Sequence, residues 1–576
     1  MSLLAVTLIA AVSLVVAYRT FGSYLSRLLR LDPTAQTPAV ALRDDVDYHP
    51  LEPSSLLSQH FSAIAAAGPI VGPILAGAMF GWVPALLWIL LGSIFIGGVH
   101  DFTALVASIR HKARSIAEVV REHMSRRSYV LFLLFVWFAL LYVIVAFTDI
   151  TASSFIGAVE LESGETVQGG GIATSSFLYL MLPIIMGVLL RFTKLTISAA
   201  TWIFLPLVGL AIWVGQYIPF DLTRLTGLNE GSAHKAWNLA LIAYCFVASL
   251  VPVWLLLQPR GHLGGWFLFL TLIGGSLGLM FSGDPVRYPA FVGWTAAKGE
   301  PLFPMLFITI ACGACSGFHA IIASGTTSKQ LRKETDAKLV GYGAMLMEAM
   351  VAVVSLCCVM RLSSTSPLIT GGPKPNFLYA QGIGSFLGVL GIPASFGVSF
   401  GLMAFTTFVY DTLDVCTRLG RYIIEELTGW RQRGGRMFAA VVTAAVPVPF
   451  LLQRSVDAAG NPIPVWRTFW ELFGASNQLL AALTLLGVTV WLWQTRRAVW
   501  VFFITGLPTV VMYVMSMWAL LRIIRVDFTA HGVTANPVPW VAMILVALAA
   551  LMAVEAFLVF FGPTLPPARR LEPAPA

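Results

Sequence analysis

Several ionisable side chains of this sequence lie inside long apolar runs. His100 and Asp101 are adjacent in one run, and Glu348 lies in a second. Asp411 and Asp414 share a third run, and their spacing of three residues places them on one face of a helix. Acids near a histidine suit proton binding and release, because histidine changes its charge near neutral pH. We therefore predict that these five residues couple a process to protons.

Internal ion pairing is the alternative role for the same acids. Arg110 follows the run that contains Asp101, and its guanidinium would neutralise that carboxylate. Arg418 stands in the same relation to Asp414. A charge near the centre of a bilayer costs on the order of 3 kcal/mol, so pairing alone would also account for such residues. The sequence leaves both roles open.

The apolar runs are long and numerous enough to cross a membrane many times. Hydrophobic residues make up 57% of the 576 residues and charged residues 11%, against roughly 25% charged in soluble domains. A bilayer core about 30 Å thick needs around 20 apolar residues per helix, which predicts an all-α polytopic membrane protein with about 15 transmembrane helices. The predicted helices cover residues 3–19, 61–81, 84–109, 129–150, 175–191, 196–218, 236–257, 264–282, 303–325, 339–361, 395–417, 437–453, 472–492, 499–523 and 538–561. The run 378–392 is too short to span and is predicted to be re-entrant.

Basic residues in the loops predict the orientation of the chain. They follow the first, third, ninth and eleventh predicted helices, precede the fourteenth, and recur near the end of the chain. With about 15 crossings all of these loops fall on one side, which the positive-inside rule assigns to the cytoplasm. We predict an N-terminus outside the cell and a C-terminus in the cytoplasm.

Glycine and proline interrupt two of the predicted helices. The helix 61–81 contains Gly-Pro-Ile-Val-Gly-Pro at 68–73. The helix 303–325 contains Gly-Ala-Cys-Ser-Gly at 313–317. Proline removes a backbone donor and glycine tolerates the released backbone, so we predict an unwound segment in each helix that binds a solute. The predicted solute-binding residues are Gly68, Pro69, Gly72, Gly313, Ser316, Gly317, His319 and Ser324.

The two interrupted helices are expected to run in opposite directions across the membrane. Paired interrupted helices of opposite orientation are typical of inverted-repeat secondary transporters. The prediction is a LeuT-like inverted-repeat core in which the unwound segments near 68–73 and 313–318 face each other at the midplane. Close helix packing through Gly-x-x-x-Gly is the alternative explanation of both motifs.

Motifs of other protein classes are missing from the sequence. The net charge of +8 comes from basic residues dispersed over short loops, so no nucleic-acid partner is expected. Neither a Gly-x-x-x-x-Gly-Lys-[Ser/Thr] phosphate loop nor a His-Glu-x-x-His zinc motif is present, and no enzyme activity is expected. Cys312 and Cys315 have the spacing of a redox or metal pair but lack a second pair, which favours packing. We therefore expect no metal and no other cofactor.

Long, unusual strings of the sequence resemble the carbon starvation protein A (CstA) family over nearly the whole chain. These strings are HFSAIAAAGPIVGPILAG at 60–77, GGVHDF at 97–102, ACSGFHAIIASGTTSKQL at 314–331 and FWELFGASNQLLAALTL at 469–485. The resemblance implies three parts: an N-terminal CstA transmembrane domain at 1–365, a C-terminal five-helix CstA domain at 366–525, and a last helix with a short cytoplasmic tail at 526–576.

The same resemblance implies uptake of pyruvate or peptides by carbon-starved bacteria. Together with the buried ionisable residues, it predicts a proton-coupled secondary transporter in the inner membrane that imports one of these nutrients. The alternative is a membrane nutrient sensor whose basic loop 110–127 contacts a signalling partner. The sequence leaves open which substrate applies and what the oligomeric state is.

Overall fold

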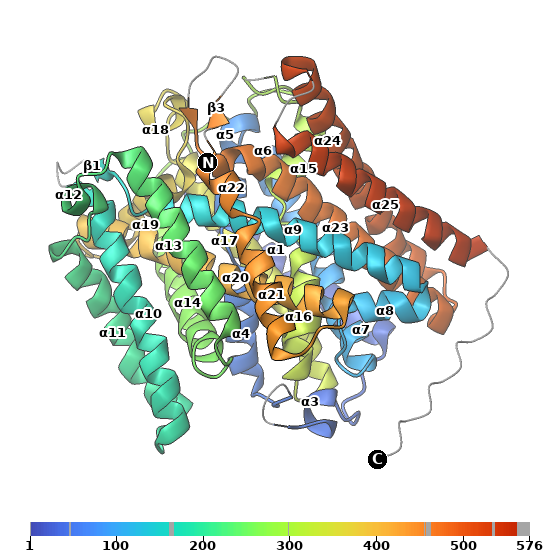
Figure 1. Cartoon of the computed structure of the whole chain (residues 1–576). Helices are drawn as coiled ribbons and strands as arrows, with labels where there is room; N and C mark the ends of the chain where they lie inside the picture. Colours follow the sequence, from blue (N-terminus) through green and yellow to red (C-terminus); the bar gives the residue numbers. More distant parts are fainter. Residues whose placement is uncertain are drawn as a thin grey trace.

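The computed structural model describes residues 2–44, 48–160, 166–297, 299–453, 455–456, 462–532 and 536–561. Helices make up most of these residues, and two short antiparallel strand pairs accompany them (Figure 1). The helical form follows from the apolar surroundings, because every backbone group in a bilayer needs a partner within its own segment.

The elements follow the apolar runs of the sequence. The first half of the chain contains α1 (Leu3–Arg19), α2 (Phe21–Leu29), α3 (Pro38–Ala41), α4 (Pro53–Ile64), α5 (Gly68–Phe80), α6 (Trp82–Gly92), the π-helix η1 (Ser93–Gly97), α7 (Gly98–Arg110), α8 (Ile116–His123), α9 (Arg126–Ser153), β1 (Ala158–Glu160), β2 (Thr166–Gln168), α10 (Gly169–Phe192), α11 (Ile197–Tyr217), α12 (Leu222–Thr226), α13 (Glu230–Leu250) and α14 (Leu257–Phe281). The second half contains α15 (Leu302–Thr309), α16 (Gly317–Gly325), η2 (Thr327–Lys329), η3 (Glu334–Asp336), η4 (Lys338–Gly343), α17 (Ala344–Met360), α18 (Pro367–Thr370), α19 (Pro375–Val389), α20 (Ala394–Thr428), α21 (Arg433–Ala445), α22 (Val448–Leu452), β3 (Ser455–Val456), β4 (Pro462–Ile463), α23 (Val465–Arg496), η5 (Phe502–Gly506), α24 (Leu507–His531) and α25 (Pro537–Phe561).

Each of the fifteen predicted helices has a helical counterpart in the structure. Among the described residues, 12 helices are long and apolar enough to cross a membrane, or up to 13 when the bent pair α4 and α5 counts as one span. The other two counterparts are α13 and the broken pair α15 and α16. The number of crossings therefore stays a prediction, as does the re-entrant assignment of 378–392, which lies in the 15-residue helix α19 and its following turn.

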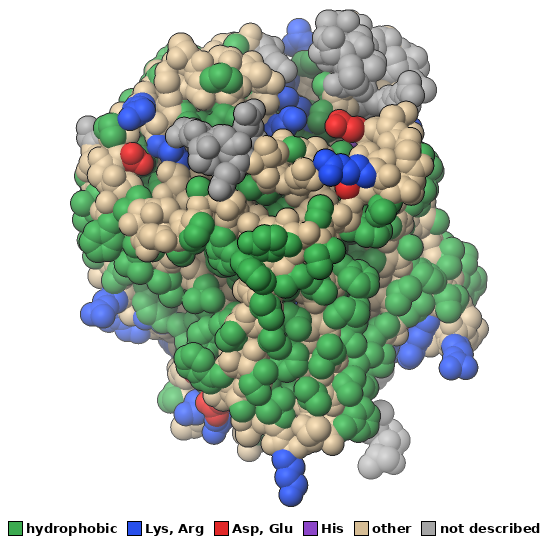
Figure 2. Space-filling model, turned by 90° about the vertical axis from the view of Figure 1, so that its left-hand side faces the viewer, with side chains coloured by type: hydrophobic (Ala, Val, Ile, Leu, Met, Phe, Trp, Pro, Cys, Tyr) green, Lys and Arg blue, Asp and Glu red, His purple; other side chains and the backbone are tan. Residues whose placement is uncertain are grey.

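The outer surface matches a protein surrounded by lipid. Figure 2 shows a broad band of hydrophobic side chains across the face on the α10 and α11 side, with charged side chains gathered above and below it. Large apolar side chains such as Phe177, Trp202 and Trp213 are exposed there. An apolar patch of this size is rare on soluble monomers.

Loops that are far apart in sequence meet at one end of the bundle, the lower end in Figure 1 near α3 and α8. Arg110 donates to the backbone oxygen of Leu29 at 2.9 Å and pairs with Glu334 at 2.7 Å, and Arg496 donates to the same Leu29 oxygen at 3.0 Å. We call this the basic end, and its basic side chains are Arg27, Arg30, Arg110, Lys112, Arg114, Lys329, Arg332, Lys333, Arg496 and Arg497. The start of α1 lies at the opposite end, where the Leu3 N–H donates to the Asp284 backbone oxygen at 3.1 Å.

The first interrupted helix breaks earlier than predicted. The helices α4 and α5 meet at a bend of 49°, and the non-helical residues between them are 65–67. The prediction of unwinding at 68–73 is wrong, since these residues form the first turns of α5. Pro69 lies in the first helical turn, where the missing N–H would have no helical partner anyway. The proline therefore starts a helix here instead of breaking one.

The second interruption is confirmed and is longer than the first. Residues 310–316 separate α15 from α16, and Gly317 is the first residue of α16. The two broken helices pack directly against each other. A side chain added at Gly68 would place its Cβ 2.4 Å from the Cβ of Cys312, and one at Gly72 would lie 2.4 Å from the Thr309 backbone oxygen. The predicted proximity of the two segments is thus found, whereas the LeuT-like inverted repeat stays a prediction.

Candidate functional site

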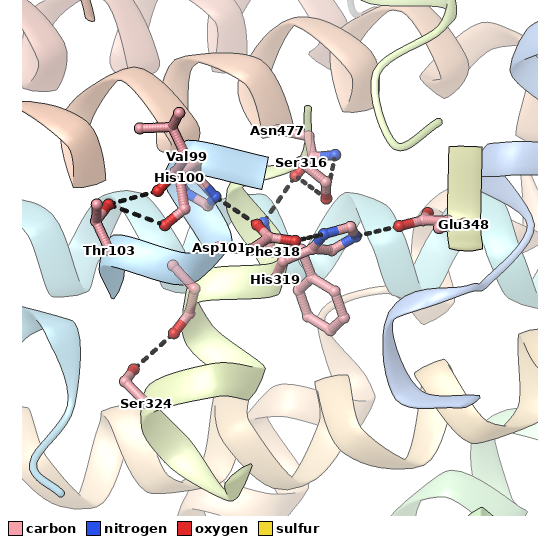
Figure 3. Close-up of polar contacts among 11 residues, drawn as sticks. Val99, His100, Asp101, Thr103, Ser316, Phe318, His319, Ser324, Glu348 and Asn477 are labelled. Atoms are coloured by element: carbon pink, nitrogen blue, oxygen red, sulfur yellow. Dashed lines mark hydrogen bonds and ion pairs between the residues drawn. The ribbon is translucent and has the colours of Figure 1, made fainter. Parts of the chain in front are cut away.

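The helix α7 and the sequence-distant helices α16 and α17 bring four ionisable side chains together. His100 and Asp101 lie in the first turn of α7, directly after the π-helical turn η1. His319 is in the first turn of α16, just beyond the second break, and Glu348 lies on α17. Single π-helical turns inside α-helices are frequent at functional sites. We call these four residues the His319 cluster (Figure 3).

The contacts within the His319 cluster form a continuous chain. His100 Nδ1 donates to Asp101 Oδ1 at 2.7 Å, and His319 Nδ1 donates to Asp101 Oδ2 at 2.7 Å. His319 Nε2 lies 3.1 Å from Glu348 Oε2, an ion pair without the alignment of a hydrogen bond. All four side chains are fully buried. The order along the chain is therefore His100, Asp101, His319 and Glu348.

This order places a titratable ring between two carboxylates. His319 carries an N–H toward both acids only when its ring is doubly protonated, and the ring is then a cation between two anions. Removing one proton leaves one acid without a donor in a buried site, which is costly. The cluster can therefore exist in states that differ by one proton, each with different contacts among α7, α16 and α17.

An amide on α23 holds the start of α16 beside this cluster. Asn477 Oδ1 accepts from the Phe318 backbone N–H at 3.0 Å and from Ser316 Oγ at 3.2 Å. Asn477 Nδ2 donates to Cys312 Sγ at 3.3 Å. These bonds satisfy backbone and side-chain groups of the break, which would be expensive to leave unpaired in a membrane protein.

The predicted solute-binding glycines face protein atoms in this conformation. A Cβ at Gly313 would lie 2.7 Å from the Cβ of Ala352, and one at Gly317 would lie 2.3 Å from the Ala481 backbone nitrogen. Together with Gly68 and Gly72, they allow helices to approach closely, as the packing alternative predicts. Their contact with a solute stays a prediction.

The other residues of the predicted solute-binding set do not lie together in the structure. His319 belongs to the buried acid cluster, and Ser316 binds the amide of Asn477. Ser324 lies two turns further along α16, where its Oγ donates to the Ala320 backbone oxygen and accepts from the Ile116 N–H at 3.1 Å. The structure therefore brings only part of this set to one place.

Asp411 and Asp414 belong to a second buried cluster, centred on an arginine. Arg260 of α14 lies with its Nε 2.9 Å from Asp411 Oδ1, while its Nη1 contacts Asp414 Oδ2. Tyr244 also contacts Nη1 and donates to Asp414 Oδ2 at 2.7 Å. Ser62 Oγ donates to Asp411 Oδ2 at 2.5 Å. We call Arg260, Asp411, Asp414 and Tyr244 the Arg260 cluster.

The ion-pairing alternative named the wrong partners, although Asp411 and Asp414 do form an ion pair, with Arg260. Arg418 donates to the backbone oxygens of Ala248 and Val251 at 2.6 and 2.7 Å. Arg110 pairs with Glu334 at the basic end, as described above. Arg110 ends α7 and pairs with the buried Glu334. Arg418 lies inside α20 and satisfies carbonyls at the end of α13, so both arginines have other partners.

Arg260 is the functional candidate that the sequence analysis missed. The predicted helix began at residue 264, which left Arg260 in a loop. In the structure α14 begins at Leu257, so Arg260 lies within the helix, and its side chain is fully buried. Its sequence signal was weak, because Pro259 and Gly261 flank it and suggest a loop. The nearby acids on α20 were the only other indication, and their relation to α14 is a matter of tertiary structure.

Polar groups of the Arg260 cluster and its neighbour Tyr179 have spare bonding capacity. Among the described residues, Arg260 Nη2, Asp414 Oδ1 and the Tyr179 hydroxyl are buried and have no hydrogen-bond partner. Such groups are few in native proteins and generally indicate a water, an ion or a functional role.

A cavity of about 70 Å³ adjoins the same cluster and extends toward the basic end. It is lined by Asp411, by Gln59 and His60 of α4, and by Thr327 and Gln330 near η2. His60 Nδ1 and Thr327 Oγ1 are 2.9 Å apart across it. About 10–15 Å³ of this volume suffices for one water molecule, so the cavity has room for several.

These features define a polytopic α-helical membrane protein with two buried charge clusters beside a pair of broken helices. The chain belongs to the carbon starvation protein CstA family, and the sequence model of this family matches residues 2–371 and 364–519. The family expectation from the sequence is thus confirmed.

Relatives within the family carry two different substrate names. The peptide transporter CstA of Helicobacter pylori (strain J99) is 31% identical over 558 residues, covering 84% of this chain and 76% of that protein. The pyruvate/proton symporter BtsT of Escherichia coli (strain K12) is also 31% identical, over 590 residues, covering 89% of this chain and 80% of the relative. Among solved structures, a mutant of the manganese transporter of Eremococcus coleocola aligns with 90% of this chain and 98% of its own, at 13% identity and a TM-score of 0.43. That value is too low to support a conclusion about fold or substrate.

Proposed function

We propose that this protein is a secondary transporter that imports pyruvate or a peptide together with protons across the inner membrane of carbon-starved bacteria. The names of its relatives support a nutrient substrate and, for one of them, proton symport. The observation that carries the proposal is the buried chain of Asp101, His319 and Glu348. A fully buried histidine between two acids is expensive to maintain for stability alone, and intramembrane ionisable groups commonly mark proton relays.

The orientation follows from the distribution of charge. The basic end is the cytoplasmic side, in agreement with the positive-inside rule. The start of α1 then lies outside, and the last helix runs toward the cytoplasm, since Ser125 Oγ near the basic end donates to Glu555 Oε2 of α25 at 2.8 Å. The cavity beside the Arg260 cluster extends to this cytoplasmic side.

The His319 cluster carries the coupled proton in this proposal. Its acids and ring belong to α7, α16 and α17, so gain or loss of one proton changes how these helices bind one another. Glu348 is the residue that gains and loses this proton, because its contact with His319 is longer and less aligned than the contacts of Asp101. His100 orients the carboxylate of Asp101.

The Arg260 cluster recognises the substrate carboxylate in this proposal. Arg260 Nη2 and the Tyr179 hydroxyl are free donors that suit a carboxylate, and a guanidinium binds such a group well. Asp414 Oδ1 is a free acceptor and would take the ammonium group of a peptide, which pyruvate lacks. Both named substrates therefore share the carboxylate contact.

The boundary between the two proposed domains runs through the Arg260 cluster but not through the His319 cluster. The His319 cluster lies wholly within residues 1–365. The Arg260 cluster joins Arg260 of that part to Asp411 and Asp414 of residues 366–525. Substrate binding across this boundary would connect the two domains, whereas proton binding would occur inside one.

Uptake into proteoliposomes tests the proposal. The purified wild-type protein should accumulate labelled pyruvate or dialanine when a pH gradient is imposed, and a sensor without transport activity should accumulate neither. Asp101→Asn should still exchange substrate in counterflow but should not accumulate it, because an amide keeps the shape of a protonated carboxyl and cannot release a proton.

A matched control uses the same substitution away from the cluster. Asp221→Asn should behave like the wild type, because Asp221 caps α12 and asparagine caps equally well. Normal pH-driven accumulation by Asp101→Asn would remove Asp101 from the coupling mechanism. Failure of the wild type to accumulate either solute would favour the sensor.

A further inference from the structure

Two histidines and a glutamate meet at the basic end, outside both buried clusters. His111 follows α7, while Glu122 and His123 end α8. One possible ligand atom from each of the three side chains lies within 4.8 Å of the other two. The two imidazole Nε2 atoms are 2.8 Å apart, with the rings nearly perpendicular at 89°.

The hydrogen bond of His111 fixes which of its nitrogens carries the proton. Its Nδ1 lies 2.6 Å from the backbone oxygen of Ala107. A carbonyl oxygen only accepts, so Nδ1 must donate. In the neutral ring the lone pair is therefore on Nε2, the atom that faces His123.

The second histidine is fixed in the same way through Gln494 of α23. The Gln494 Nε2 amide donates to the His123 backbone oxygen at 3.1 Å, which sets the orientation of the amide. Its Oε1 then lies 2.8 Å from His123 Nδ1 and must accept from it. The lone pair of neutral His123 is therefore also on Nε2.

Two lone pairs thus face each other at hydrogen-bond distance, an arrangement that needs a cation between them. We propose that His111, His123 and Glu122 bind a divalent transition-metal ion through the two Nε2 atoms and the carboxylate. Metal-binding histidines typically donate their other N–H to a carbonyl or a side-chain oxygen, as both do here. Metal binding here does not depend on the transported substrate, whereas the cytoplasmic location of the site rests on the orientation given under the proposed function.

The ligand set indicates the class of ion. Two imidazoles suit Zn²⁺, Ni²⁺ or Cu²⁺, and a carboxylate completes three protein ligands with one position open to water. Tetrahedral Zn²⁺ with Zn–N bonds near 2.05 Å would hold the two nitrogens about 3.3 Å apart. The rings would then separate by about 0.5 Å, a small movement for half-buried side chains.

A shared proton is the competing way to satisfy the two nitrogens. Burial is the main cause that lowers the pKa of His123 below its ordinary value, and the adjacent His111 lowers it further. Metals bind the neutral ring, so a metal ion and a proton compete for this position. Glu122 would also offset the charge of a metal ion within a basic loop.

Metal binding at this site would join helices that carry the His319 cluster and its support. His111 directly follows α7, which contains Asp101, and Gln494 lies on α23, which contains Asn477. A metal ion would tie α7 to α8, and through Gln494 to α23, at the basic end. Regulation of the protein by intracellular metal is the role that this position suits.

Zinc titration of the purified full-length protein tests the site. Isothermal titration at pH 7.5 should give one Zn²⁺ per chain for the wild type. The double variant His111→Asn/His123→Asn should bind at least 100-fold more weakly, because it loses two of three ligands. Glu122→Gln should bind about tenfold more weakly, while Glu118→Gln on the same helix should match the wild type, since Glu118 pairs with Arg121.

Cobalt spectroscopy and thermal unfolding complete the test. Co²⁺ should give visible bands of a four-coordinate site in the wild type and not in the double variant. Unchanged unfolding temperatures without metal would show that the variants fold. Equal Zn²⁺ affinity of the wild type and the double variant, or no stoichiometric binding by the wild type, would overturn the proposal and leave the shared proton as the explanation.

Discussion

The two buried clusters solve the problem of charge inside a membrane protein in different ways. The His319 cluster contains two acids and two histidines, so its charge depends on bound protons. The Arg260 cluster contains two acids and a guanidinium, which stays charged at every physiological pH. The first is enclosed by protein, whereas the second adjoins a cavity through Asp411.

In the proposed function, this difference separates two tasks that a coupled transporter must perform. A titratable cluster can store and release a proton without a large change in shape. A permanent cation can hold an anionic group of a substrate at any pH. The comparison teaches that acids which look alike in the sequence can have different partners, a histidine in one cluster and an arginine in the other.

The largest expected effect is a loss of stability when the permanent charge of Arg260 is removed. Arg260→Met should destabilise the protein by about 3–5 kcal/mol, because it leaves two buried acids without their cation. Thermal unfolding of the purified variant measures this change. Arg121→Gln is the control, since it removes an exposed partner of Glu118 and should change little. A variant at Arg260 with wild-type stability would show that the guanidinium does not balance the acids.

The next effect distinguishes the roles of the acids. Glu348→Gln should lower pH-driven accumulation at least tenfold while counterflow continues, because it removes one anion from the His319 cluster. Asp411→Asn should instead raise KM and keep the pH dependence of uptake, because it perturbs the position of Arg260. Measuring both parameters on the same vesicles tests the comparison, and identical phenotypes for the two variants would contradict it.

A moderate effect is expected where the broken helices meet beside the His319 cluster. Gly72→Ala would place a Cβ 2.4 Å from the Thr309 backbone oxygen, and overpacking of this kind costs about 1–3 kcal/mol. Gly209→Ala is the control, because no atom lies within 4 Å of its added Cβ, and it should stabilise α11 by roughly 0.5–1 kcal/mol. Thermal unfolding compares the two, and equal stability would mean that the break relaxes freely.

The smallest effect concerns a single hydroxyl. Tyr179→Phe should raise KM about tenfold, corresponding to one lost hydrogen bond to a charged group. The unfolding temperature should not fall, because this hydroxyl has no hydrogen-bond partner within the described part of the chain. Uptake kinetics at a fixed pH gradient provide the measurement. An unchanged KM would place the substrate carboxylate away from Tyr179.

The sequence predicted the helical elements well because the signal is local. The number of apolar residues in a run decides whether it can cross a bilayer, and this number can be counted without knowing the neighbouring helices. The positions of the breaks were less predictable. Pro69 was expected to unwind a helix, yet it lies in the first turn of α5, where proline is well tolerated. Whether a proline starts or interrupts a helix depends on the chain before it.

By itself the sequence determined the class of protein, the family, and the ionisable residues that lie within apolar segments. Only the tertiary structure decided the partners of these residues. His319 contacts Asp101 across 218 positions, and Arg260 reaches Asp414 across 154. The physical reason is that hydrophobic length is a property of each segment, whereas a charge in a membrane is stabilised by whichever opposite charge the packing of other helices brings near.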